Sequence, residues 1–369
     1  MAPTALAILT TTFPAGAERN KALATWSAMG GFGAAAALLI GGSLTTTLGW
    51  EWIFYLNLPV AVGMLGLSPV LLRESLARAR ARAYDPAGAV TAIAALAVGL
   101  YAVVTGPEAG WASVHTLGLL AVSAALVAVF IGIESRSVAP LMPLGTVSSR
   151  TFTGGNLLTL LTGMTALGIS LMVSQYAQQV LGYSPLTFGI GTAVIPVMAA
   201  VGSYAGQSVV TRIGHRPVGV AGMVLLGAAG LLLAQVSAGG GYLGDLVLGL
   251  LLFGLGLGGS AVAALTAVFT GVAGEQPGLG SGVNTAAFQV GGALGVAITT
   301  TVATSRTAEV LAGSAGQGEP LVALTEGFRA GFMVAAGFTL LGLLVAATLL
   351  SHARRQPDQS EPAPAVARD

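Results

Sequence analysis

The chain has 369 residues, of which 54% are hydrophobic and only 8% are charged, and its mean hydropathy is +0.83. Soluble globular proteins carry about 25% charged residues, so this composition excludes a soluble or secreted domain and a nucleic-acid-binding protein. It indicates a protein that lies in a lipid bilayer. The net charge of +1 says little as a sum, because in a membrane protein the placement of the charges matters. The absence of cysteine excludes disulfides and thiolate metal sites.

Long apolar stretches, bounded by charged residues or by proline and glycine, predict ten full membrane-spanning helices. A span needs about 20 apolar residues, and only a helix satisfies its own backbone hydrogen bonds in lipid when no barrel pattern is present. We therefore expect an all-α integral membrane protein with spans at residues 22–45, 52–72, 87–105, 114–133, 152–177, 186–206, 217–237, 243–270, 280–304 and 327–350.

Two terminal segments do not fit a full span. Residues 1–13 are apolar but too short to cross a hydrocarbon core of about 30 Å. They predict the inner part of a helix whose beginning is missing. The tail, residues 351–369, is polar and rich in proline, and we expect it to be disordered and cytoplasmic.

The basic residues predict an orientation in the membrane. Only Arg306 and Arg329 fall on one side of the predicted spans, and the other thirteen of the 15 basic residues fall on the opposite side. Because cytoplasmic loops are rich in Lys and Arg, we expect a multi-pass plasma-membrane protein with its C-terminus in the cytoplasm. The thirteen residues are Arg19, Lys21, Arg73, Arg78, Arg80, Arg82, Arg136, Arg150, Arg212, Arg216, Arg354, Arg355 and Arg368.

The ionisable residues offer no site for a membrane enzyme, a metal or a cofactor. The three histidines are scattered, and every Asp and Glu lies in a loop, at a helix end or in the tail. Asp245 and Glu326 lie closest to the membrane interior, and Glu326 is expected to form a helix-end ion pair with Arg329. We therefore expect no enzyme, no metal and no cofactor. The sequence also shows no mid-membrane carboxylate, the group that usually carries proton coupling.

A polar stripe runs along the predicted span 152–177. Its members fall within about 60° of one another around a helix of 3.6 residues per turn. Any single serine or threonine among them is better explained by a hydrogen bond to a neighbouring helix. For the stripe as a whole we favour a water-filled substrate pathway. The stripe consists of Asn156, Thr159, Gly163, Ser170 and Ser174, with Gln178 extending it outward, and Asn284 and Gln289 in the span 280–304 are weaker candidates.

Glycine patterns predict close contacts between helices. The run Gly254, Gly256, Gly258 and Gly259 follows no strand and lies inside an apolar span, so it indicates helix packing rather than a dinucleotide loop. Gly291 and Gly295 form a small-xxx-small contact face.

Several segments at characteristic spacing carry a family resemblance. The chain resembles the major facilitator superfamily, specifically the fourteen-helix drug:proton antiporter branch of multidrug exporters. The resemblance covers residues 1–350. It is carried by FPAGAERNKAL (13–23), GWEWIFYLNLPV (49–60), YDPAGAV (84–90), APLMPL (139–144), QYAQQVLGYSPL (175–186), TRIGHRP (211–217) and GLGSGVNTAAFQVGGALGVAI (278–298).

The resemblance implies an exporter of small hydrophobic or amphipathic molecules that works by alternating access and is driven by protons, with the lipid bilayer as its surroundings. It implies a cytoplasmic gate loop at Arg212, Gly214 and Arg216, although Thr211 stands where the family usually has Asp. It also implies an antiporter-type glycine-rich helix, in which Ala37-Leu38 replace the usual Gly-Pro and a straighter helix is expected. The glycines kept in that helix are Gly30, Gly33, Gly41 and Gly42.

The resemblance further predicts a division of the chain and a missing start. Helices 1–3 of the family pattern lie before residue 1, so we expect either an internal start in a longer gene or the product of a decayed or split gene. The alternative function is a non-transporting membrane protein, truncated or acting as a structural partner of another chain. The expected parts are an N-terminal bundle remnant (1–72, equivalent to helices 4–6), a basic cytoplasmic linker (73–86), two extra helices (87–133), a second cytoplasmic linker (134–151), a C-terminal six-helix bundle (152–350) and the tail (351–369).

Overall fold

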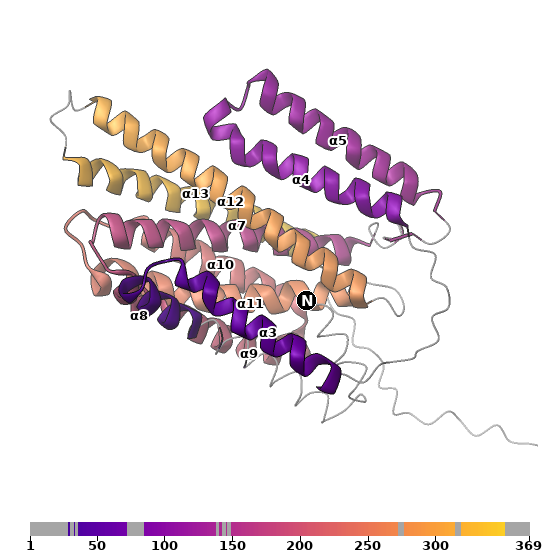
Figure 1. Ribbon diagram of the computed structural model, residues 1–369, viewed down its shortest axis with the longest axis horizontal. Coiled ribbons are helices and arrows are strands. Elements are labelled where there is room, and N and C mark those ends of the chain that lie inside the picture. The colour runs from indigo at the N-terminus through magenta and orange to yellow at the C-terminus, as the bar shows by residue number, and fades with distance from the viewer. Residues whose placement is uncertain are drawn as a thin grey trace, which may run out of the picture.

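The computed structural model is all-helical in the part of the chain that it describes (Figure 1). Nine helical segments in this part are long and apolar enough to cross a membrane, in agreement with the expected fold class. The predicted span 22–45 is described only in part, as a shorter apolar helix at Ala36–Thr47. The predictions for residues 1–13 and 351–369 concern residues outside the described ranges. These ranges are Met29, Gly33, 36–71, 85–137, 140–141, 145, 149–271, 277–313 and 319–350.

The described helices follow the predicted spans in order. Helices α8 and α9 together form one span, and the π-helical turn η1 continues into α11 to form another. The bounds are α3 (Trp52–Leu71), α4 (Pro86–Ala109), α5 (Val114–Glu134), α7 (Arg150–Gln179), α8 (Pro185–Thr192), α9 (Val194–Ile213), α10 (His215–Leu233), η1 (Tyr242–Leu246), α11 (Val247–Gly271), α12 (Pro277–Gly313) and α13 (Pro320–Thr348).

Short polar side chains fix where several helices begin. The Asp85 carboxylate accepts a hydrogen bond from the Gly88 amide at 2.8 Å and caps α4. Ser113, Ser149 and Ser184 cap α5, α7 and α8 in the same way, each accepting from an amide three residues further on. Each cap satisfies one of the amides that the first helical turn leaves without a partner.

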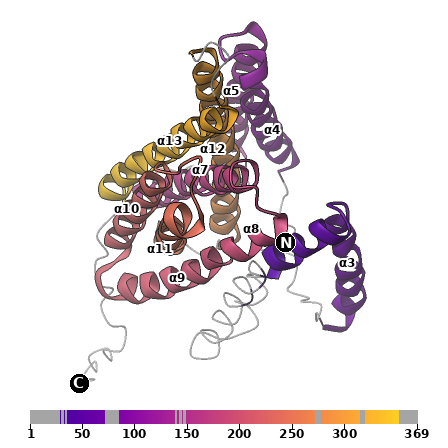
Figure 2. The ribbon, with the colours of Figure 1, turned by 90° about the vertical axis from the view of Figure 1, so that its left-hand side faces the viewer.

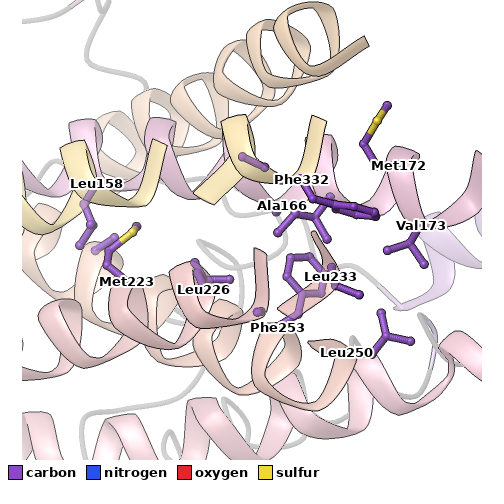
Figure 3. Close-up of a cluster of buried hydrophobic side chains, with 14 of the residues drawn as sticks. Leu158, Ala166, Met172, Val173, Met223, Leu226, Leu233, Leu250, Phe253 and Phe332 are labelled. Carbon is purple, nitrogen blue, oxygen red and sulfur yellow. The ribbon is translucent and has the colours of Figure 1, made fainter. Parts of the chain in front are cut away.

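Helix α7 lies at the centre of the spans between residues 150 and 348. It packs against α11, α12 and α13, and α10 packs against α11 and α13 (Figures 1 and 2). Side chains from four of these helices meet in one buried cluster, which Figure 3 shows in close-up. Lipid is as apolar as these side chains, so their shape complementarity, rather than exclusion from water, favours this arrangement. The cluster includes Leu158, Met223, Leu226, Phe253 and Phe332.

Glycines allow helix backbones to approach closely at two crossings. A Cβ atom at Gly291 or Gly295 of α12 would overlap a backbone carbonyl of α7, so the predicted contact face is confirmed. In α11, Gly254 and Gly258 meet the backbone of α9, whereas Gly256 meets the backbone of α10. The glycine run of α11 therefore serves packing on two sides, as predicted.

Helices α9 and α10 diverge from a one-residue connection. Gly214 joins them with φ of +91°, a conformation that favours glycine. The two helices make few contacts with each other, and α11 lies between them (Figure 2).

Helices α4 and α5 form a hairpin at the edge of the molecule (Figure 1). The two helices pack along each other, and the Ser123 hydroxyl of α5 donates to the Ala95 carbonyl of α4 at 2.8 Å. Helix α4 also contacts α12, which joins the hairpin to the other spans. By contrast, no part of the span in α3 is buried inside the structure.

Candidate substrate pathway

The inner part of the polar stripe lies at the crossing of α7 and α12. Thr159 is buried, and its hydroxyl accepts a hydrogen bond from the Asn284 amide of α12 at 2.6 Å while donating to the Gly155 carbonyl at 3.0 Å. One turn further along α7, Gly163 is buried against the backbone of α12 at Phe288. The structure thus brings Thr159, Gly163 and Asn284 together, and they hold two helices in contact.

Asn156 lies one turn before this crossing and is half-buried. Its amide nitrogen donates to the Phe152 carbonyl at 3.0 Å within the same helix. Its side-chain oxygen is shielded from solvent, and within the described part of the chain it accepts no hydrogen bond. A buried acceptor of this kind can receive a hydrogen bond from a donor that enters the pathway.

The outer part of the stripe is open. Ser170 and Gln178 are exposed, Ser174 is half-buried, and the Gln178 amide donates to the Ser174 hydroxyl at 2.9 Å. The stripe residues near the start of α7 therefore contact another helix, whereas those near the end of α7 are accessible polar groups.

The hydrogen bond between Thr159 and Asn284 leads to a stability prediction. Thr159→Val keeps the side-chain volume but removes the acceptor of the Asn284 amide, so we expect the free energy of unfolding to fall by about 1 kcal/mol. SDS-induced unfolding in mixed micelles measures this change. The matched control is Thr304→Val in α12, because Thr304 is exposed and bonds only within its own helix. Equal effects of the two substitutions would contradict a role for this inter-helix bond.

A second polar network lies at the helix ends that the charge pattern predicts to face outward, and the sequence predicted only its ion pair. The Asp245 carboxylate in η1 accepts from the Tyr176 hydroxyl of α7 at 2.7 Å and from the Ser237 amide at 3.0 Å. Arg329 of α13 donates to the Val236 carbonyl at 2.7 Å. It also forms the expected ion pair with Glu326, at 2.6 Å. We call these residues the outer network, and they tie α7, the loop before η1 and α13 together.

The predicted gate loop lies at the turn between α9 and α10. Gly214 is buried at this turn, Arg212 is exposed in the last turn of α9, and Arg216 is half-buried in the first turn of α10. The sequence placed His215 in a loop, but it is the first residue of α10 and is 2% exposed. Thr211 donates to the Ser208 carbonyl within α9 at 2.9 Å.

The glycine-rich helix at Ala36–Thr47 touches α8. A Cβ atom at Gly42 would lie 2.8 Å from the Pro185 carbonyl oxygen, and one at Gly189 would lie 2.5 Å from the Leu38 carbonyl oxygen. Gly33 and Gly41 have no neighbour at the corresponding positions, and Gly30 lies outside the described residues. Of the three predicted glycines that the structure describes, Gly42 is the one that forms a close contact here.

The spans, the glycine contacts and the polar stripe define a multi-pass membrane protein of the transporter class. The sequence matches the profile of the Major Facilitator Superfamily over residues 1–296 and again over 155–368. The chain belongs to this superfamily. Its members are transporters rather than enzymes, which confirms the expectation that the chain is not an enzyme.

The chain is similar to several curated resistance proteins. It is 33% identical to the tetracenomycin C resistance and export protein of Streptomyces glaucescens, over 84% of this chain and 57% of that protein. It is 34% identical to the puromycin resistance protein pur8 of Streptomyces alboniger, over 95% of this chain and 69% of that protein. It is also 34% identical to the multidrug resistance protein Stp of Mycobacterium tuberculosis, over 80% and 54% respectively. The matched region thus spans between about half and two thirds of these relatives.

Proposed function

We propose that the chain takes part in the export of small hydrophobic or amphipathic molecules across the plasma membrane by alternating access. The observation that carries this proposal is the polar stripe of α7, which leaves accessible hydroxyl and amide groups on a helix that is otherwise buried among apolar neighbours. Exposed hydroxyl and amide groups do not stabilise a helix surface that faces lipid, whereas a path for a substrate requires them. The resistance and export proteins among the relatives support the same function.

In this proposal Asn156, Thr159, Ser170, Ser174, Gln178 and Asn284 line the path, with Gly163 allowing α12 to approach. Arg212, Gly214 and Arg216 close the cytoplasmic side, and the contact between Gly42 and α8 closes the opposite side. We propose proton motive force as the driving energy because the sequence resembles the antiporter branch.

The packing supports the proposed division of the chain. Helix α7 packs against α11, α12 and α13, while α9 and α10 pack against α11, which supports a C-terminal bundle at 152–350. The α4–α5 hairpin contacts this bundle through α12, which supports two extra helices at 87–133. The basic connections support a cytoplasmic C-terminus.

A dye-export assay tests the proposed path. Ser170→Leu replaces an exposed hydroxyl of the stripe by an apolar side chain, so we expect the initial rate of export of a lipophilic cationic dye to fall several-fold while the protein level is unchanged. The matched control is Ser208→Leu, since Ser208 is an exposed serine on α9 outside the stripe. If cells with the unaltered chain in their membranes retain as much dye as cells that lack it, the export proposal is wrong.

The alternative is a membrane protein that does not transport and acts as a structural partner of another chain. The exposure of α3 along its whole span favours this alternative, because in a single chain such a helix gains no packing. Purification of the 369-residue chain distinguishes the exporter from the non-transporting structural partner. A monodisperse monomer that binds the dye supports the exporter, and a chain that is stable only with a second protein supports the alternative.

A further inference from the structure

A cavity with opposite charges lies at one end of the α4–α5 hairpin. It has a volume of about 590 Å³ and is lined by Asp85, Val129, Gly132, Ile133, Arg136 and Ser137. Asp85 caps the start of α4, and Arg136 follows the end of α5, so both belong to the same end of the hairpin. None of these lining residues belongs to the polar stripe of α7, and they take no part in the proposed path.

The two charges of the cavity do not satisfy each other. One oxygen of Asp85 accepts from the Gly88 amide, but the other, Oδ2, is shielded from solvent and accepts no hydrogen bond within the described residues. The Arg136 side chain forms no ion pair among those residues. A buried acceptor and an exposed guanidinium in one cavity suit a ligand that carries both an ammonium donor and an anionic acceptor.

The neighbourhood of Asp85 favours the ammonium end of such a ligand. A Cβ atom at Gly88 would lie 2.8 Å from Asp85 Oδ2 and 3.2 Å from Glu134 Oε2, so the two carboxylates lie beside each other. Glu134 is 3% exposed. The Asp85 carboxylate is a negatively charged acceptor that lines the cavity, and it attracts a cation.

The apolar wall of the cavity points to a lipid rather than a soluble zwitterion. Val129 is 51% exposed and lies on the last turns of α5 together with Ile133, and both line the cavity with the charged groups. In a membrane these positions adjoin the acyl chains, and the charged residues lie at the level of the headgroups. We propose that this cavity binds the headgroup of a zwitterionic phospholipid with a primary amine, a phosphatidylethanolamine. Its ammonium donates to Asp85 and its phosphate accepts from Arg136.

Native mass spectrometry of the full chain in detergent, with added lipid, tests the proposal. We expect phosphatidylethanolamine to bind about tenfold more tightly than phosphatidylcholine, because a trimethylated ammonium has no N–H to donate to Asp85 Oδ2. Asp85→Asn removes the charge but keeps an oxygen for the helix cap, so this preference should be lost while the protein stays folded. Arg136→Gln should weaken the binding of both lipids.

A pair of glycine substitutions makes the test independent of charge. Gly132 lines the cavity and has no atom near the position of a Cβ, so Gly132→Leu should fill the cavity without disturbing the hairpin. Gly118→Leu is the control, because Gly118 lies on the same helix with equally open surroundings but outside the cavity. We expect Gly132→Leu to abolish the preference for the ethanolamine lipid and Gly118→Leu to keep it.

Two outcomes would overturn the proposal. One is equal binding of the two lipids to the unaltered chain, or an unchanged preference in both Asp85→Asn and Gly132→Leu. The other is displacement of the lipid by glycerophosphoethanolamine at the same concentration, since the headgroup without acyl chains would then be the ligand. Retention of the lipid against the soluble headgroup supports the proposal.

Discussion

Gly295→Ala in α12 is expected to lower the free energy of unfolding by about 1–3 kcal/mol, the usual cost of overpacking a close contact. The added Cβ would lie 2.5 Å from the Met164 Cα atom of α7 and would overlap the Met164 carbonyl oxygen. These are backbone atoms, so no side-chain rotation relieves the overlap and the two helices must separate. Because Asn284 lies on the same helix, the hydrogen bond to Thr159 should also lengthen.

The control for this prediction is Gly282→Ala, 13 residues earlier in α12. A Cβ at Gly282 has no neighbour within 4 Å, and alanine is a better helix former than glycine by about 1 kcal/mol. Gly282→Ala should therefore leave the SDS unfolding midpoint unchanged or raise it. If Gly295→Ala is as stable as Gly282→Ala, the close approach of α7 and α12 is incorrect.

Asp245→Leu is expected to lower the free energy of unfolding by about 2–4 kcal/mol, because hydrogen bonds to a charged acceptor contribute more than neutral ones. The carboxylate holds both the Tyr176 hydroxyl and the Ser237 amide. Tyr176 is 0% exposed and also stacks edge-on against Phe328 at a centroid distance of 6.2 Å. Without Asp245, the contact of the loop before η1 with α7 rests on the Tyr176 hydroxyl and the Ser237 carbonyl, 2.8 Å apart.

A double-mutant cycle identifies the bond itself. Tyr176→Phe and Asp245→Asn should show a coupling energy of about 1 kcal/mol, whereas Tyr183→Phe, in the connection between α7 and α8, should show none with Asp245→Asn. Additive effects of Tyr176→Phe and Asp245→Asn would mean that the outer network does not contribute as a unit.

The sequence predicted the membrane spans well because hydropathy alone determines which segments enter lipid. It predicted their ends less well where a helix continues into water. Helix α12 was expected to end at residue 304 but extends to Gly313, and its last turns carry the exposed ion pair of Arg306 and Glu309, at 3.3 Å. A hydropathy boundary marks the edge of the lipid, whereas the helix ends where its hydrogen bonds end.

The span expected at 186–206 shows a second limit. It consists of two helices, α8 and α9, that meet at Ala193, and it continues to Ile213. The segment has no charge that marks this junction, and the contacts of Gly189 with Leu38 involve a residue 151 positions earlier in the chain. Such a contact depends on the tertiary arrangement and is not encoded in the local pattern.

The same reason limits what could be predicted of the site. The spacing of the polar residues placed Thr159 and Gly163 on one face of α7, but their meeting with Asn284 joins residues 125 apart. Asp245 stood out as an acidic residue near the membrane interior, yet its partner Tyr176 is 69 residues away and carries no charge that would indicate a pair. The spacing of residues predicts which of them share one face of a helix. Which residues of other helices they contact depends on how the helices pack in the fold.

The divergence of α9 and α10 has a consequence for how the protein is made. Synthesis proceeds from the N-terminus, so both helices leave the ribosome before α11 does. The single residue Gly214 holds them together at one end, but their separation in the finished protein depends on α11, which packs against both. The arrangement of α9 and α10 can therefore be completed only after α11 has left the ribosome, and its small glycine surfaces then allow close contact with both neighbours.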